Sequence, residues 1–255
     1  MKKTLKRIII LTLALLYFYA GFWASVEAAG QFLTTADGTH ENPTSPAAFK
    51  SAASNAGYKS SLPAFKSAAQ DMDIKCRRIG PITREECFVD EEGSPVRGFT
   101  IEDPQPGDIF VTASTHSLGW RHGHVALVVG TEPLTTIEAV VLGQKSRIIE
   151  NPMWERYPTF AHLRLKDEYG GAELAAETAE FALKELTNCS YGFFCDKDCV
   201  DSSGSADEDE EKYHCAHLVW RAYKEIGLDI DSDGGKVVTP FDIYNSSYFE
   251  SAHYG

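Results

Sequence analysis

The sequence is short of positive charge. It has 24 lysines and arginines against 37 aspartates and glutamates, which gives a formal net charge of −13. Beyond the extreme N-terminus the basic residues form no cluster. Nucleic acids and anionic lipid surfaces are bound through clustered positive charge, so the composition argues against both as partners.

The sequence also lacks the spacings typical of metal sites. It contains neither paired CxxC motifs nor an HExxH motif. A zinc site is therefore only a formal alternative, and its ligands would be His122, His124, Cys215 and His217. A calcium site lacks the later glutamate of the calcium-loop motif, and its ligands would be Asp196, Asp198 and Asp201. We expect no metal and no other cofactor.

The N-terminus has the pattern of a targeting segment. Four basic residues (Lys2, Lys3, Lys6 and Arg7) precede an apolar run over residues 8–24. Val26-Glu27-Ala28 follows, with small residues at the positions that a signal peptidase reads. This pattern predicts a signal peptide over residues 1–28 and a secreted or extracytoplasmic protein of the cell envelope. The apolar run is long, so an uncleaved membrane anchor is the alternative, and a membrane is expected as a partner only in that case.

Export makes disulfides available to the six cysteines. Cys76 and Cys87 form the most local pair, and Cys189 could pair with Cys195 or Cys199. If Cys215 is a reactive thiol, one of the other five cysteines stays unpaired, which is a difficulty for assigning it a catalytic role.

Two regions follow the signal segment. Residues 29–100 are predicted to be a partly helical N-terminal extension. It contains two similar segments, 46–53 and 63–69, each typical of a short helix with proline in its first turn. Within it, residues 76–99 are charged and rich in turn residues. Residues 101–255 are predicted to form the main domain.

The main domain has an α+β pattern. Short apolar runs at regular spacing predict strands over 109–112, 125–129, 137–141, 147–149 and 160–165. Strands at this spacing favour an antiparallel sheet or a half-barrel. A strong helical periodicity covers 171–186, an acidic run typical of a solvated loop covers 207–211, and residues 237–243 suggest an extended piece and a final turn or helix.

Cys215 lies at the start of a second amphipathic helix, in which Leu218, Val219, Ala222 and Ile226 recur at helical spacing. Free backbone N–H groups and the helix dipole favour an anion at this end of a helix. A thiol placed there ionises more easily, and the same N–H groups can hold a developing oxyanion. The alternative is a buried or disulfide-bonded structural cysteine.

A nucleophilic thiol needs a base and a group that orients the base. His124 and Glu138 are the candidates, since a hairpin with its turn centred on residue 131 would place them opposite each other and on one face. A carboxylate inside the apolar run 137–142 is costly unless it is exposed or partnered. His122 has the same strand parity and is the competing base. His217 is interpreted as structural or as lining the pocket.

Four motifs in this order resemble the circularly permuted papain-like hydrolases of the NlpC-type superfamily, in the YiiX/YebB-like group. They cover residues 106–110, 123–130, 138–139 and 213–223. The resemblance spans roughly residues 98–247, and a proline-containing tail at 238–243 also matches. The chain departs from the group at Ala216 and His217, where a serine and an acidic or polar residue are frequent, which puts the substrate preference in doubt.

The resemblance implies a secreted amidase or peptidase with Cys215 as nucleophile, His124 as general base and Glu138 as orienting residue. Tyr213, Ala216 and Pro240 are expected at the oxyanion and substrate-binding positions. The expected substrate is a peptide or amide, with peptidoglycan as a candidate source. Two alternatives stay open: a thioesterase or acyltransferase on lipid-like esters, and a catalytically silent, disulfide-stabilised binding domain.

Overall fold

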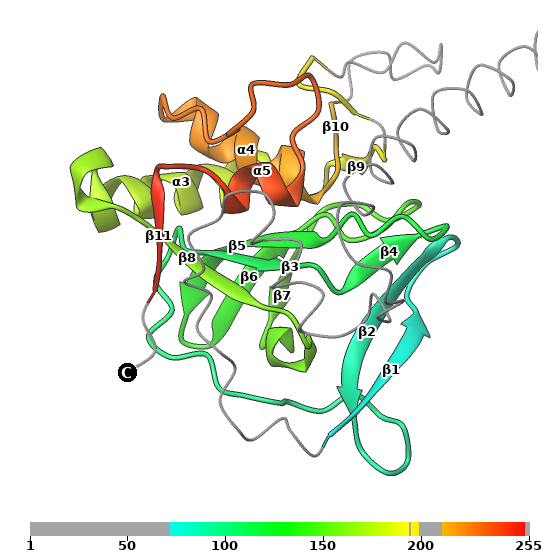
Figure 1. Cartoon of the computed structure of the whole chain (residues 1–255). Helices are drawn as coiled ribbons and strands as arrows, with labels where there is room; N and C mark the ends of the chain where they lie inside the picture. Colours follow the sequence, from blue (N-terminus) through cyan, green and yellow to red (C-terminus); the bar gives the residue numbers. More distant parts are fainter. Residues whose placement is uncertain (1–71, 194, 199–210, 253–255) are drawn as a thin grey trace, which may run out of the picture. The chain divides into compact units, whose positions relative to one another are not determined.

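A six-stranded antiparallel sheet is the centre of the fold, in the order β11-β8-β3-β5-β6-β7 (Figure 1). Its strands are β3 (Ile109–Thr112), β5 (His124–Thr131), β6 (Leu134–Glu138), β7 (Arg147–Glu150), β8 (Ala161–Leu165) and β11 (Phe249–Ser251). The sheet is open, with β11 and β7 at its edges. The predicted α+β class and antiparallel sheet are confirmed.

This computed structural model describes residues 72–193, 195–198 and 211–252, all within one compact unit, Leu62–Gly255. The predicted signal segment 1–28 and the two short helical segments 46–53 and 63–69 lie outside the described residues, as do Cys199 and Asp201. No helix in the described part of the chain combines the length and apolar character that a membrane crossing needs.

Side chains that alternate along the central strands fill two separate cores. In β5, Val125 and Leu127 pack on one side of the sheet, whereas Ala126 and Val128 pack on the other. Successive residues of a strand point to opposite faces, so a continuous apolar run produces a sheet buried on both sides. The two sides are called the helix-side core and the aromatic core below.

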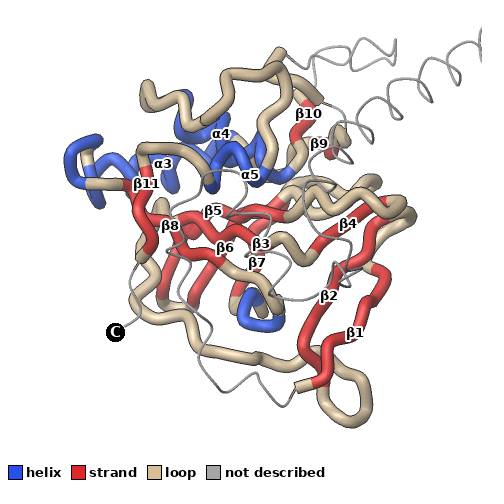
Figure 2. Tube along the Cα trace, viewed as in Figure 1, coloured by secondary structure: helices blue, strands red, loops and turns tan. Residues whose placement is uncertain are grey.

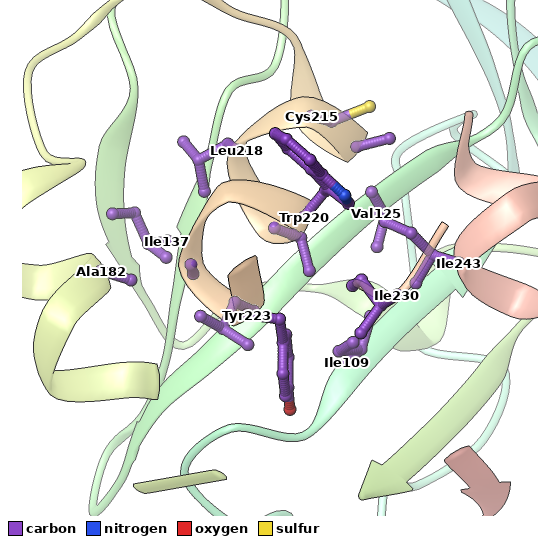
Figure 3. Packing of buried hydrophobic residues seen from close by; sticks show 14 of the residues in the cluster. Ile109, Val125, Ile137, Ala182, Cys215, Leu218, Trp220, Tyr223, Ile230 and Ile243 are labelled. Atoms are coloured by element: carbon purple, nitrogen blue, oxygen red, sulfur yellow. The ribbon is translucent and has the colours of Figure 1, made fainter. Parts of the chain in front are cut away.

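The helix-side core lies between the sheet and the helices α3 (Gly171–Glu185), α4 (Cys215–Glu225) and α5 (Pro240–Tyr244) (Figures 1 and 2). Helix α4 is buried along most of its length and ends before Gly227, whose φ of 94° stops the helix in a left-handed turn. Leu218, Tyr223 and neighbouring α4 side chains pack directly on the strand that carries Val125 (Figure 3).

The aromatic core covers the opposite face of the sheet. Its members are Ile101, Phe110, Ala126, Val128, Trp154, Tyr157 and Phe160. Trp154 begins the short 3-10 helix η1 (Trp154–Arg156), and its ring contacts the rings of Phe110 and Tyr157 with centroids 5.8 and 5.2 Å apart.

Residues 73–89 form a hairpin that belongs to the main unit. Strands β1 (Asp73–Arg78) and β2 (Thr83–Val89) pair antiparallel, and β2 also pairs with β4 (Thr115–Ser117). The sequence analysis did not predict these strands within its charged, turn-rich segment 76–99, because the charged residues obscured the strand pattern. The carboxylate of Glu85 is fully buried and is neutralised by Arg77 and Arg156.

The same hairpin excludes the most local cysteine pairing in this structure. Cys76 faces Glu86 and Cys87 faces Lys75 across the ladder, so the two thiols point to opposite faces of the hairpin. Cys76 is exposed, Cys87 is buried, and both are free thiols.

The remaining predicted elements are present with small shifts. The strand predicted over 137–141 is β6, which begins at Leu134 and ends at Glu138, the residue opposite the first residue of β7. The helix predicted over 171–186 is α3, and the tail 237–243 contains α5. The structure adds a short 3-10 helix, η2 (Asp167–Tyr169), and a parallel two-stranded ladder of β9 (Ser190–Tyr191) and β10 (Lys212–Tyr213).

We predict that Leu218→Ala lowers the free energy of unfolding by about 2–5 kcal/mol, because it leaves a cavity in the helix-side core where the side chain is fully buried. The matched control is Leu142→Ala, where 43% of the leucine is exposed and the expected change is within about 0.5 kcal/mol. Urea unfolding followed by circular dichroism measures both variants. Equal losses would contradict the assignment of Leu218 to the core.

Candidate active site

Cys215 is the first residue of α4, and its sulfur points away from the apolar core of the helix (Figure 3). His214 caps the helix: its Nδ1 accepts a hydrogen bond from the backbone N–H of His217 at 3.3 Å. The Nε2 of His214 donates to the backbone carbonyl of Cys195 at 3.1 Å. First-turn N–H groups lack acceptors within their own helix, so the N–H groups of Cys215 and Ala216 lie beside the thiol at the positive end of the dipole.

His124 and Glu138 form a buried hydrogen-bonded pair. Nε2 of His124 lies 2.8 Å from Oε2 of Glu138, and about 5% of each side chain is exposed. The other carboxylate oxygen, Oε1, accepts hydrogen bonds from Thr136 Oγ1 at 2.7 Å and from Trp154 Nε1 at 2.9 Å. Three donors therefore offset the cost of burying the carboxylate.

Trp154 also fixes the orientation of the imidazole. Its ring stacks on that of His124 with centroids 5.3 Å apart and an angle of 8° between the planes. Since Nε2 faces Glu138, Nδ1 is the ring nitrogen available to Cys215, whose interaction with His124 shifts the pKa values of both groups.

The pKa values of Cys215 and His124 move in opposite directions. Burial by itself raises the pKa of Cys215, but its interactions with His124 and His214 outweigh that effect and lower the pKa to about 6. Burial lowers the pKa of His124, but its hydrogen bonds to Cys215 and Glu138 outweigh that effect and raise the pKa to about 10. Burial also opposes ionisation of Glu138, whose pKa is nevertheless lowered by His124, Thr136 and Trp154. The arrangement favours a thiolate–imidazolium pair.

His124 and Glu138 share a face of the sheet, as predicted, but the register of their two strands differs from the predicted one. Leu127 lies opposite Ile137, and this register continued along the strands puts Ala126 opposite Glu138. His124 is therefore two residues away from the opposed position and reaches Glu138 diagonally on the same face. The turn is at Glu132–Pro133, later than the predicted centre, and a bulge lies between Val128 and Gly130.

Gly123 allows the chain to enter β5 at the position that His124 requires. Its φ is 75°, and a Cβ atom at this position would lie 2.7 Å from the carbonyl oxygen of Thr112. Only glycine meets both conditions without displacing the neighbouring strand.

A small cavity of about 40 Å³ lies beside the thiol. Tyr191, His214, Cys215 and Pro240 are among the residues that line it. Burial, followed by the negative charge of Cys215, raises the pKa of Tyr191, so its hydroxyl stays protonated as a donor beside the thiolate.

The structure brings Pro240 to the cavity but not Tyr213. The hydroxyl of Tyr213 donates to Glu211, and its ring packs on His217 with centroids 4.8 Å apart. Ala216 is fully buried in the helix-side core, so only its backbone can face the cavity. Tyr191 has the position that the sequence analysis gave to Tyr213.

The competing histidines have other roles. His122 is held by Ser117 Oγ at 2.9 Å and by its own hydrogen bond from Nδ1 to the carbonyl of Gly123 at 2.7 Å. Burial lowers the pKa of His122 to about 4. His217 is buried between Tyr213 and Trp220 and is structural.

The described residues do not assemble the formal zinc set. Within the described ranges, the group of ligand atoms close enough to share an ion is Asp231, Asp233 and Asp242. Each of these carboxylates is already bonded, to Lys197, to the N–H of Gly235 and to Thr239, respectively. In the proposed calcium set, the Asp198 N–H donates to Asp196, and Asp201 lies outside the described residues.

Sequence reasoning missed Trp154, Thr136, His214 and Tyr191 as site residues. Thr136 could have been found, because it lies two residues before Glu138 and shares its face. Trp154 comes from a separate 3-10 helix, and Tyr191 is brought beside Tyr213 by the pairing of β9 with β10, and neither contact has a sequence signal.

No family model matches the chain, and no curated protein matches it. One solved structure is similar: the metalloprotein YiiX from Escherichia coli O157:H7, described as DUF1105, with 15% identity and a TM-score of 0.44. The match covers 60% of this chain and 98% of that chain.

We predict that alkylation of Cys215 by iodoacetamide follows a pKa near the value of about 6 given above. Because this pKa is lowered on folding, the thiolate is present at neutral pH and the rate falls as pH decreases through 6. The same thiol in the urea-unfolded chain should titrate near about 8.5. Mass spectrometry of the peptide that contains Cys215 measures the rate. His124→Ala should move the midpoint upward, and an unchanged midpoint would contradict the hydrogen bond.

We also predict that Trp154→Phe, which keeps an aromatic ring on His124 but removes the donor to Glu138, raises the alkylation midpoint of Cys215. It should also lower the free energy of unfolding by about 1–3 kcal/mol. The matched control is Tyr157→Phe, which removes a 2.9 Å hydrogen bond to a different buried carboxylate, Glu85. The control should lose stability and leave the midpoint unchanged. A shift of equal size in both variants would assign Trp154 a packing role only.

Proposed function

We propose that the protein is a cysteine hydrolase that works through a thioester acyl-enzyme, on a permuted papain-like fold of the NlpC-type, YiiX/YebB-like kind. Cys215 is the nucleophile, His124 the general acid and base, and Glu138 the orienting residue. The observation that carries the proposal is the buried His124–Glu138 pair, whose carboxylate has three donors, together with the mutual pKa shifts of His124 and the Cys215 thiol at the start of α4.

In the first step the Cys215 thiolate attacks the carbonyl carbon of an amide or ester, and a carbon–sulfur bond forms. The carbonyl electron pair moves to oxygen, where the N–H groups of Cys215 and Ala216 and the Tyr191 hydroxyl are the available donors. Collapse of this intermediate breaks the bond to the leaving group, which takes the proton held by His124.

In the second step His124, now neutral, removes a proton from water, and the hydroxide attacks the thioester carbon. The carbon–sulfur bond breaks, the carboxylic acid leaves and the thiolate is restored with His124 protonated again. Glu138 accepts from Nε2 throughout, so Nδ1 stays directed at the sulfur and stabilises the charged imidazole.

The proposed setting is outside the cytoplasm, reached through the targeting segment 1–28, with peptides or amides of the cell envelope as substrates. The free thiol of Cys215 argues against a silent domain in which this cysteine is used up in a disulfide. Neither metal nor cofactor is required, because the thiolate, the imidazole and the backbone donors supply the nucleophile, the proton transfers and the oxyanion contacts.

We predict hydrolysis of p-nitrophenyl acetate with a burst of p-nitrophenol and an acetyl group on Cys215, detected by intact mass and peptide mapping after acid quench. Cys215→Ala should abolish both signals. Glu138→Gln should lower the turnover rate by about 10²–10⁴-fold, because the imidazolium loses its charged partner. Cys76→Ala removes an exposed free thiol on strand β1 and should leave turnover unchanged. Turnover that survives in Cys215→Ala would rule the proposal out.

A further inference from the structure

We infer that the cavity beside Cys215 is an acyl-binding slot that selects an uncharged, apolar acyl group. This inference rests on the proposed hydrolase function and names the substrate class for that site. The residues that define the aromatic slot are Trp120, His122, Phe193, Val237, Val238 and Pro240.

Three aromatic rings form one part of the slot. The rings of Trp120, His122 and Phe193 contact one another edge-on, with centroids 5.6, 5.8 and 6.1 Å apart. Such a mutual arrangement keeps each ring in place, so the surface offered to a ligand is preformed. The segment that leads into α5 supplies the aliphatic part through Val237, Val238 and Pro240.

Apart from the Cys215 thiolate, the described lining offers no charge to a ligand. None of the described lining residues is an aspartate, glutamate, lysine or arginine. His122 accepts from Ser117 and donates to the carbonyl of Gly123, so both ring nitrogens are occupied and the ring is neutral. Thr239, also in the lining, directs its hydroxyl to Asp242.

This lining decides which substrates enter. A carboxylate placed there would lose hydration, gain no ionic partner and lie beside the negative charge of Cys215, so it is disfavoured. An anionic peptide is further disfavoured by the chain's net charge of −13. An aliphatic or aromatic acyl group instead gains burial against both parts of the slot.

The size of the slot restricts the group to a slender one. The cavity volume is only about 40 Å³. Trp120 is 49% exposed, so a longer chain can continue outward over its ring. The expected acyl group is therefore a short unbranched chain or the first carbons of a longer one.

The test uses alkylation of Cys215, which needs only the thiolate and therefore does not depend on turnover. N-propyl iodoacetamide is compared with N-(2-carboxyethyl) iodoacetamide, which has a tail of similar length that ends in a charge. Each rate is divided by the rate with glutathione to correct for intrinsic reactivity. We expect at least a tenfold preference of Cys215 for the propyl reagent.

Trp120→Ala and Phe193→Ala should each reduce this preference at least threefold, and Trp120→Phe should retain most of it. The matched control is Leu118→Ala, since Leu118 lies two residues from Trp120, is 74% exposed and does not line the slot. Thermal melting of each variant confirms that it is folded.

Equal corrected rates for the two reagents would overturn the inference of an acyl-binding slot. A preference for the propyl reagent that all variants keep would overturn it as well. These outcomes are distinguishable from failure of the hydrolase proposal, which would appear as ester turnover that does not require Cys215. A preference for the charged reagent would also overturn the slot and would favour a charged peptide as substrate.

Discussion

The buried carboxylate of Glu138 is the constraint on which the site depends. An ionised group in the interior of an apolar sheet is unstable without donors, and it has three here, from Thr136, Trp154 and His124. The need to satisfy this one charge fixes the tautomer and plane of the imidazole. The imidazole in turn stabilises the thiolate of Cys215. The low pKa of the Cys215 thiol in α4 thus depends on Glu138, which belongs to strand β6.

The sequence was sufficient for elements whose signal is local. Apolar runs located the five predicted strands of the central sheet, and helical periodicity located α3 and α4. Strand parity placed His124 and Glu138 on the same face. The helical periodicity placed Cys215 in a first turn, where the backbone N–H groups lack acceptors within their own helix. These features follow from neighbours within a few positions, so Cys215, His124 and Glu138 could be selected together.

Features that depend on distant partners could not be read in this way. Trp154 reaches Glu138 from a separate 3-10 helix, and Tyr191 reaches the cavity through the pairing of two two-residue strands. The β1–β2 hairpin was missed because the sequence does not distinguish a buried glutamate such as Glu85 from an exposed one. Only its contacts with Arg77 and Arg156 distinguish it. The register error at Glu138 has the same origin, since the turn at Glu132–Pro133 and the bulge after Val128 set the alignment.

The thiol and its base belong to opposite sides of the sheet. Cys215 is anchored in the helix-side core, whereas His124 is held by Trp154 of the aromatic core. The thiol and the imidazole therefore meet only when both halves are docked on the sheet. A chain on its way to the native state, or partly melted, therefore carries an inert, protonated sulfur. The lowered pKa of the thiol is thus a property of the fully packed chain and is absent from any state in which the two cores are apart.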